Sequence, residues 1–378
     1  MELCFEQIKI KDFKTMLISS HRLPKSFKDK ANQKVAKISG LLLGAVTPER
    51  QSTLPKEFEL SSHILYKRFG STHYGVMIPD LPEPFRYLSW ASVLGYVGFT
   101  ITDTNYQMSK DGKGDTASLV HGTALSTTSE AYRTFSIKND IKFSQTPFGI
   151  NFDNQTVLHE DGDGFILITK REDLELQLHL KPTKAISWFS YGGLYKHFSV
   201  LMHYEGLIKQ KGNQARVEGL CTLESWKSIA TSMLKNKWLV ENIQLPVKVF
   251  SYQVINIDHE QQLLLAFICY EDQPIMTSVY YRHVNGTSIQ YNGDILFEVT
   301  SLQQEAQITP DGFPMNVPNT FRWIAYHNDQ KVLDISAHVD TPYCFGLAAG
   351  YVSSYAWQGE FHDQVLVGRG YIEYIDRR

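Results

Sequence analysis

The chain has 378 residues, of which 43% are hydrophobic and 20% are charged, and its formal net charge at pH 7 is −3. This composition is typical of a globular protein. It excludes a disordered chain and lacks the basic surplus of a nucleic-acid-binding protein, so no nucleic-acid partner is expected. The length allows a sizeable core, and we expect two domains.

The N-terminal segment predicts neither secretion nor a membrane span. Residues 1–14, MELCFEQIKIKDFK, alternate charged and apolar side chains, unlike the continuous apolar core of a signal peptide. The apolar run Gly40–Val46 is far shorter than the roughly 20 residues that cross a bilayer. We therefore expect a cytoplasmic protein without a transmembrane segment, and peripheral membrane contact stays open.

The cysteines and histidines show no metal-binding pattern. Cys4, Cys221, Cys269 and Cys344 are scattered without a CxxC pair, so we expect reduced, mostly buried thiols. The 13 histidines show no HxH or HExxH spacing. The sequence therefore predicts no metal and no cofactor.

Alternation of apolar and polar residues dominates the chain. In DLELQLHL, residues 173–180, the four leucines fall on one face and the polar residues on the other. KVLDISAHV, residues 331–339, alternates in the same way, and the DGDG segment at 161–164 marks a hairpin turn between two strand-like runs. We predict an all-β protein made of antiparallel strands.

Three segments depart from this alternation. LLLAFICY, residues 263–270, is apolar on both faces, as expected for a strand covered on both sides by core, another element or a lipid-like ligand. Helical spacing predicts helices over Lys25–Ile38 and Ser225–Leu239, the second capped by Ser225. The Ser-, Gly- and aromatic-rich residues 181–195 suggest a domain boundary near residue 186, giving domains 1–186 and 187–378.

Segments in both halves resemble one family. His73–Trp90, Ser190–Trp226 and Gly368–Arg377 are similar to the lipocalin-like tandem β-barrel superfamily, which contains carotenoid 1,2-hydratase (hydroxyneurosporene synthase), tocopherol cyclase and fungal Diels–Alderases, and most of all to an uncharacterised bacterial branch. The resemblance implies two lipocalin-like antiparallel β-barrel domains in tandem with a few short helices. It also implies an apolar small molecule bound inside one barrel or between the two.

The resemblance does not carry a mechanism with it. Better-known members have an Asp-His or Asp-Arg-rich turn followed by Trp-Gly, and this chain has Thr222–Trp226, TLESW, at that place. The aspartate and the histidine are missing, so the acids and ligand contacts have to be sought among this chain's own residues.

Glu373 stands out in the closing segment GRGYIEYIDRR. If residues 365–375 form one strand, Glu373 shares a face with Arg369 and Tyr371. A buried carboxyl must be paired, hydrogen-bonded or protonated, and a protonated one can act as a general acid. A structural ion pair and simple solvent exposure remain the alternatives.

Glu218 and Glu224 share a face with Trp226 on another predicted strand. Six residues at about 3.3 Å each put the two carboxyls about 20 Å apart, which is too far for both to act on one atom. Glu224 also precedes the predicted helix, where a carboxylate stabilises the N-terminus. Trp226 is a candidate ligand contact.

His203 and Tyr204 lie on opposite faces of a predicted strand, with Tyr204 on the face of Phe198, Val200 and Met202. Inside an apolar cavity, the Tyr204 hydroxyl could orient a ligand carbonyl or hydroxyl. A tyrosine packed in the core is the alternative.

These observations predict a protein that binds an apolar small molecule of the terpenoid, polyketide or lipid-like kind. As an enzyme it would be a cofactor-free hydratase, cyclase or isomerase, with Glu224, Glu373 and Glu218 as candidate acids and Tyr204, His203, Arg369, Tyr371 and Trp226 as candidate ligand contacts. A non-catalytic lipid or isoprenoid carrier and a structural or stress-related interaction protein are the alternatives.

Overall fold

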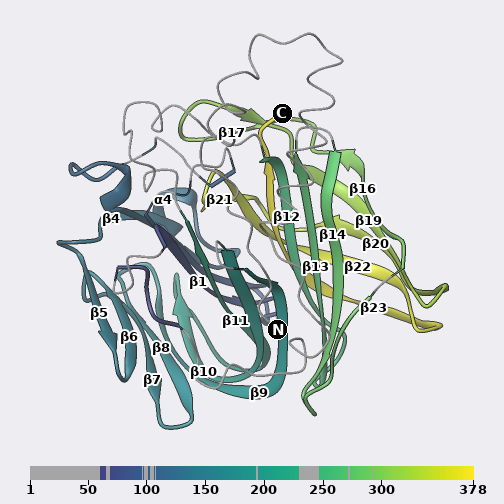
Figure 1. Cartoon of the computed structure of the whole chain (residues 1–378), viewed down its shortest axis with the longest axis horizontal. Coiled ribbons are helices and arrows are strands. Elements are labelled where there is room, and N and C mark those ends of the chain that lie inside the picture. Colours follow the sequence, from purple (N-terminus) through teal and green to yellow (C-terminus); the bar gives the residue numbers. More distant parts are fainter. Residues whose placement is uncertain are drawn as a thin grey trace, which may run out of the picture.

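The computed structural model describes residues 60–64, 69–95, 97, 101–102, 106, 108–192, 195–229, 247–270, 273–291 and 293–378. Over these residues the protein is nearly all β, and two curled antiparallel sheets, a barrel and a half-barrel, lie beside each other (Figure 1). The predicted all-β fold is confirmed. In the part of the chain described, no helix combines the length and the apolar character that a membrane span requires.

The first sheet runs in the order β4-β3-β2-β1-β11-β10-β9-β8-β7-β6-β5 and is purple to teal in Figure 1. Its strands are β1 (Ser71–Ile78), β2 (Leu88–Gly95), β3 (Thr116–Gly122), β4 (Tyr132–Ser136), β5 (Ile141–Gln145), β6 (Phe148–Phe152), β7 (Thr156–Asp161), β8 (Gly164–Lys170), β9 (Glu175–Tyr191), β10 (Tyr195–Gln210) and β11 (Asn213–Ser228). The short helices η1 (Lys113–Asp115) and α4 (Thr128–Ala131) flank β3.

The second sheet runs in the order β15-β14-β13-β12-β23-β22-β20-β19-β16, with β21 paired to β22. Its strands are β12 (Val247–Asn256), β13 (Gln261–Tyr270), β14 (Gln273–His283), β15 (Ser288–Gln290), β16 (Ile295–Leu302), β19 (Pro318–His327), β20 (Gln330–Val339), β21 (Cys344–Leu347), β22 (Gly350–Phe361) and β23 (Gln364–Asp376). β17 (Gln307–Ile308) and β18 (Pro314–Met315) form a separate pair. The first sheet thus ends at Ser228, and the boundary predicted near residue 186 falls within β9.

The alternating segments form strands with the predicted faces. Leu176, Leu178 and Leu180 of β9 are buried in the core of the first sheet, and the residues between them are exposed. Leu333 and Ile335 of β20 lie in the core of the second sheet. Each sheet therefore has its own core, because side chains alternate between the two faces of a strand.

A third apolar layer joins the two sheets. Its buried members, which define what we call the seam, are Met77, Tyr87, Ala91, Val120, Ala131, Phe189, Tyr252, Val254, Leu264, Ala266, Tyr280, Cys344, Leu347, Val352 and Tyr371. This layer explains why residues 263–270 are apolar on both faces: in β13, Leu263 and Leu265 face the second core, whereas Leu264 and Ala266 face the seam.

The prediction that a helix begins at Ser225 is wrong. Residues 225–228 continue β11, which pairs with β1 on one side and β10 on the other: Ser225 lies opposite Tyr74 and Phe198. Strand pairing on both sides satisfies the backbone here, and this tertiary context overrides the helical spacing. The remainder of that helix beyond residue 229, and the helix predicted over Lys25–Ile38, lie outside the described residues.

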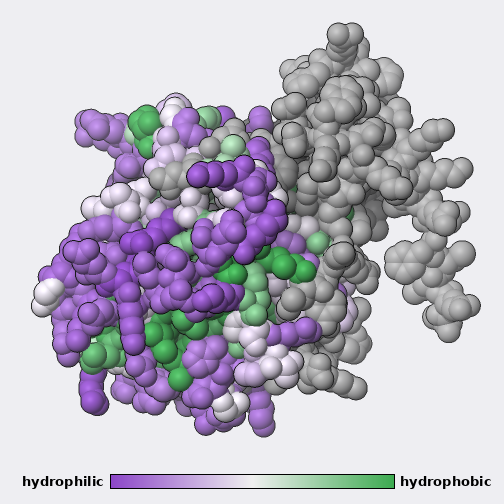
Figure 2. All heavy atoms as spheres, turned by 90° about the vertical axis from the view of Figure 1, so that its left-hand side faces the viewer, coloured by the Kyte–Doolittle hydropathy of each residue, from purple (hydrophilic) through white to green (hydrophobic). Residues whose placement is uncertain are grey.

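The outer side of the first sheet is polar. β8 alternates buried and half-exposed residues along its length. Figure 2 shows the side of the molecule where β5–β8 lie. The coloured surface there is mostly hydrophilic, with hydrophobic side chains grouped near its middle. Three of the four cysteines, Cys221, Cys269 and Cys344, are buried and reduced as predicted, and Cys4 lies outside the described residues.

Candidate active site

Two carboxyl groups from different sheets are buried at the seam. Glu224 on β11 and Glu373 on β23 are each only 4% exposed. Cys221 and Leu223 of β11 point into the first core, so Glu224 points to the opposite face, toward the second sheet. On β23, Tyr371 belongs to the seam and Glu373 follows on the same face.

The strand order of the first sheet gathers side chains around Glu224. Trp226 on the central strand β11 lies directly opposite His73 on β1 and His197 on β10. Two residues earlier on the same face of β11, Glu224 lies opposite Gly75 and Ser199. A Cβ on Gly75 would lie 3.0 Å from His73 Nε2, so the glycine leaves the space in which that ring approaches the carboxyl.

Both histidine rings present Nε2 to the same carboxyl oxygen. His197 Nε2 lies 2.6 Å and His73 Nε2 3.7 Å from Glu224 Oε1. His73 Nδ1 lies 2.8 Å from the carbonyl oxygen of Ser92, which assigns the hydrogen of the neutral ring to Nδ1. The Tyr195 hydroxyl lies 3.0 Å from His197 Nδ1, so that His197 donates from Nε2 to Glu224.

These neighbours decide the protonation of Glu224. Burial by itself would raise the pKa of the carboxyl, but His197 and then His73 and Tyr252 bring that pKa below its usual value. Burial lowers the pKa of His73 to about 4. At neutral pH, Glu224 is thus a carboxylate beside a neutral His73 ring.

Aromatic rings cover the two histidines. Trp226 stacks on His73 with the ring centres 5.5 Å apart, and Phe189 stacks on His197 at 4.5 Å. Trp226 and Tyr195 are only half-buried. His197 is also partly exposed, whereas His73 and Glu224 are buried.

Glu373 has a different environment. The Tyr371 hydroxyl donates to Glu373 Oε1 at 3.0 Å and lies 2.9 Å from Ser89 Oγ, which belongs to the first sheet. Burial raises the pKa of Glu373 well above its usual value, and the charge of Glu224 raises it further, whereas the Tyr371 hydrogen bond lowers it. Glu373 is therefore favoured as a neutral carboxylic acid.

A buried cation from the second sheet completes the cluster. Arg282 on β14 is 0% exposed, and its Nη1 donates to the carbonyl oxygen of Ser199 at 2.9 Å and to Ser199 Oγ at 3.1 Å. Its Nη2 donates to Gln262 Oε1. Burial lowers the pKa of Arg282 to about 10, against the opposing effects of Tyr252 and Glu224. Arg282 therefore stays charged at neutral pH.

The structure brings together four of the eight predicted site residues: Glu224, Glu373, Tyr371 and Trp226. Glu218 and His203 are exposed, on parts of β11 and β10 that the second sheet does not cover. Tyr204 packs in the first core with Phe198, Val200 and Met202, on the face predicted for it.

Arg369 lies at the rim of the seam. It forms ion pairs with Asp340 and, at 3.8 Å, with Asp80, which follows β1. Asp340 also lies 4.0 Å from Arg86, on the connection between β1 and β2. This network ties the β1–β2 connection of the first sheet to the second sheet.

Sequence reasoning missed His73, His197, Tyr252 and Arg282. The two histidines reach Glu224 only through the order β1-β11-β10, which no local pattern reveals. Arg282 did carry a signal, because a charge within the apolar run SVYYRHV requires a buried partner if the strand is covered on both faces.

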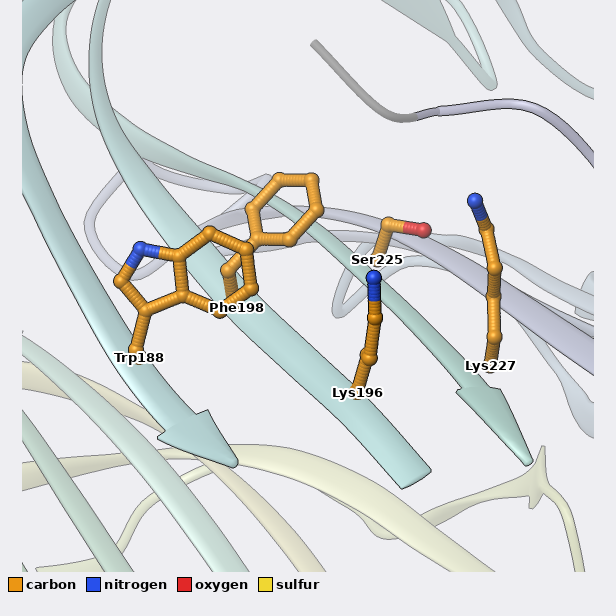
Figure 3. Close-up of a pocket in the computed structure, with 5 residues that line it drawn as sticks. All are labelled: Trp188, Lys196, Phe198, Ser225 and Lys227. Atoms are coloured by element: carbon orange, nitrogen blue, oxygen red, sulfur yellow. The ribbon is translucent and has the colours of Figure 1, made fainter. Parts of the chain in front are cut away.

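Two hollows lie in the described part of the molecule. The one in Figure 3 is lined by Trp188, Lys196, Phe198, Ser225 and Lys227 of β9, β10 and β11, with the two lysines pointing the same way. Its volume of about 10 Å³ holds no more than about one water molecule.

The second hollow is a cleft of about 390 Å³ lined by Tyr106, Thr127, Thr128, Ser129 and Tyr132, a volume in the range of small-molecule sites. Its side chains are hydroxyl-bearing and carry no formal charge. Across the part of the chain described, no group of three or more His, Cys, Asp and Glu side chains is arranged to hold a metal ion.

The sequence of residues 91–378 matches the model of a protein family, DUF6670, which is described as a family of unknown function. The chain belongs to this family. The matched region contains His197, Glu224, Tyr252, Arg282 and Glu373, whereas His73 and Ser89 precede it. No match was found among curated protein sequences.

The structure of this DUF6670 protein superposes on solved structures of other proteins. An AttH candidate from Nitrosomonas europaea superposes with a TM-score of 0.56 at 14% identity, over 88% of this chain and 99% of that one. Kievitone hydratase from Nectria haematococca gives 0.48 at 10% identity, over 88% and 96%, and CghA with Sch210972 gives 0.44 at 7% identity, over 88% and 94%. At these identities the similarity concerns the fold alone.

Proposed function

We propose that this DUF6670 protein binds an apolar small molecule of the terpenoid, polyketide or lipid-like kind at the seam and acts on it as a cofactor-independent hydratase, cyclase or isomerase. One observation carries the proposal: two equally buried carboxyls from opposite sheets have pKa values displaced in opposite directions. With pKa values displaced in this way, one carboxyl is a neutral acid and the other is a carboxylate base at the same pH.

In the proposed reaction Glu373 is the general acid. Its neutral carboxyl transfers a proton to an alkene carbon or a carbonyl oxygen of the ligand, while the Tyr371 hydroxyl, 3.0 Å away, stabilises the carboxylate that forms. Tyr371 is held by Ser89 of the first sheet, so the acid is oriented by both sheets.

Glu224 is the proposed base. His197 donates to its Oε1 and holds the carboxylate in place, which leaves Oε2 for a proton taken from the ligand or from water. The Trp226 ring beside His73 provides a π face that stabilises a positive charge developing on the ligand. Glu218 and His203 have no part in this scheme.

The test is turnover by three matched variants. Native mass spectrometry with an organic extract first identifies a co-purifying ligand class, which then serves as substrate. We expect Glu373→Gln and Glu224→Gln each to reduce turnover by about 100-fold or more, and Glu373→Gln to leave ligand affinity within about threefold. Glu218→Gln, a change in an exposed carboxyl of the same β11 strand, is the control and keeps full turnover.

A carrier of the same ligands is the alternative. Stoichiometric ligand that leaves the wild-type protein chemically unchanged would favour it. Full turnover by Glu373→Gln would remove the general acid, and failure of every apolar compound to bind would remove the function altogether.

A further inference from the structure

Three polar atoms at the seam are fully buried and lack a hydrogen-bond partner among the described residues. They are Glu224 Oε2, Tyr252 Oη and Arg282 Nε, on β11, β12 and β14. Their residues are 4%, 2% and 0% exposed, respectively. The three atoms therefore come from both sheets and from three separate strands.

These three atoms belong to one cluster of side chains. Arg282 donates twice to Ser199, which lies directly opposite Glu224 on the neighbouring strand. Tyr252 Oη lies next to both Glu224 and Ser199, and hydrogen bonding toward them shifts the pKa of Tyr252, but neither contact has the geometry of a full hydrogen bond. The Arg282 charge acts on Tyr252 as well. Tyr252 is also opposite Glu373 in the β12–β23 pair, so the proposed acid adjoins the same atoms.

The hydrogen-bonding capacity of the three atoms defines the group that would satisfy them. Arg282 Nε–H can only donate, the Glu224 carboxylate can only accept, and the Tyr252 hydroxyl can do either. A carbonyl oxygen would serve the arginine and the tyrosine but not the carboxylate. A hydroxyl oxygen serves all of them, because it accepts with its lone pairs and donates with its hydrogen.

We propose that Glu224, Tyr252 and Arg282 form a subsite for one hydroxyl oxygen, supplied by a ligand alcohol or by a water molecule. The inference rests on the proposed function and restricts it to ligands that carry a hydroxyl group or react with water. For hydration the step balances: water loses a proton to Glu224 and its oxygen bonds to one alkene carbon, while the Glu373 proton bonds to the other. Loss of water reverses each transfer.

The subsite is tested with three probes of matched length, which are decan-1-ol, methyl nonyl ether and undecane. The alcohol donates and accepts, the ether only accepts, and the alkane does neither. Each probe competes with a fluorescent apolar probe for the full-length chain. We expect the alcohol to bind about tenfold more tightly than the ether, because only the alcohol satisfies the carboxylate.

Tyr252→Phe should weaken binding of the alcohol and of the ether alike, because the tyrosine hydroxyl can donate to both, and Tyr204→Phe should leave both affinities unchanged. Tyr204 is the matched control because it is a buried tyrosine of the first core, away from the seam. Glu224→Gln replaces an acceptor-only oxygen by an amide that can donate, so the preference should shift toward the ether. Thermal melts of all variants verify that they are folded.

The outcomes separate the two sources of the oxygen and separate this inference from the proposed function. A preference for the alcohol that Glu224→Gln removes assigns the subsite to a ligand hydroxyl. Equal binding of the probes, with a solvent oxygen in a crystal structure within hydrogen-bonding distance of all three atoms, assigns it to water. Equal binding with no oxygen there overturns the subsite and leaves the function standing. If no apolar probe binds, the proposed function fails, and the ligand-hydroxyl assignment fails with it.

Discussion

Glu224 and Glu373 lie on the two sides of the seam, are equally buried, and are held in opposite protonation states. On the first sheet, Glu224 receives a hydrogen bond from His197, which stabilises its carboxylate. On the second sheet, Glu373 accepts a hydrogen bond from a tyrosine hydroxyl and lies near the negative charge of Glu224. The difference shows that burial sets the cost of a charge, whereas the neighbours decide which group carries it.

The largest expected effect comes from removing the cation that both sides share. Arg282→Met removes a buried charge on which Glu224 acts, and it deletes the hydrogen bonds to Ser199 and Gln262, whose buried oxygens then lose their donor. We expect a loss of about 3–5 kcal/mol of the free energy of unfolding, measured with denaturant.

The control for Arg282 is Arg322→Met. Arg322 pairs with Asp334 and its side chain is 41% exposed, so its loss should cost less than about 1 kcal/mol. Equal losses in the two variants would contradict a specific role for the buried cation.

The next largest effect concerns the hydrogen bond that stabilises the Glu224 carboxylate on the first sheet. His197→Asn removes the 2.6 Å hydrogen bond to Glu224 and should cost about 2 kcal/mol at pH 7. Because the folded pKa of Glu224 is lowered, this contribution is present above the unfolded value of 4.5 and disappears as the pH falls through the folded pKa. Unfolding at pH 7 and pH 4 measures it. His203→Asn, an exposed change on the same β10 strand, should match the wild type at both pH values.

On the second-sheet side, the expected effect depends on pH with the opposite sign. The pKa of Glu373 is raised on folding, so between 4.5 and its folded pKa the native state binds a proton that the unfolded state has lost. Wild-type stability should therefore fall relative to Glu373→Gln by about 1.4 kcal/mol per pH unit as the pH rises through this window. Stability curves for the two proteins from pH 5 to pH 8 test this. Parallel curves would show that Glu373 titrates normally, and Glu218→Gln should stay parallel.

The smallest effect concerns the rim that holds the two sides together. Arg369→Ala removes the ion pairs with Asp340 and Asp80 and should cost about 1 kcal/mol or less, since they are partly exposed. Added salt should weaken the difference from the wild type by screening. A cost that does not change with salt would point to lost packing instead. Lys209→Ala, which breaks a more exposed pair with Glu175, is the control with a still smaller effect.

Local sequence patterns predicted the strands and their faces because side-chain direction depends only on backbone periodicity. Tyr204 falls on the same face as Phe198 and Val200, and Tyr371 and Glu373 share a face, as the alternation requires. The helix predicted from Ser225 shows where this reasoning fails. Helical spacing of apolar residues there competes with two strand partners, β1 and β10, that lie far away in the sequence.

Sequence periodicity is enough to predict an antiparallel β fold, to place Glu224 on one strand face with Trp226, and to place Glu373 on another with Tyr371. The packing of the two sheets brings these faces together at the seam, makes His73 and His197 converge on Glu224, and adds Arg282 to the cluster. The physical reason is that periodicity acts between neighbours in the chain. Burial and charge pairing at the seam instead depend on which strands lie side by side and which sheet faces are covered.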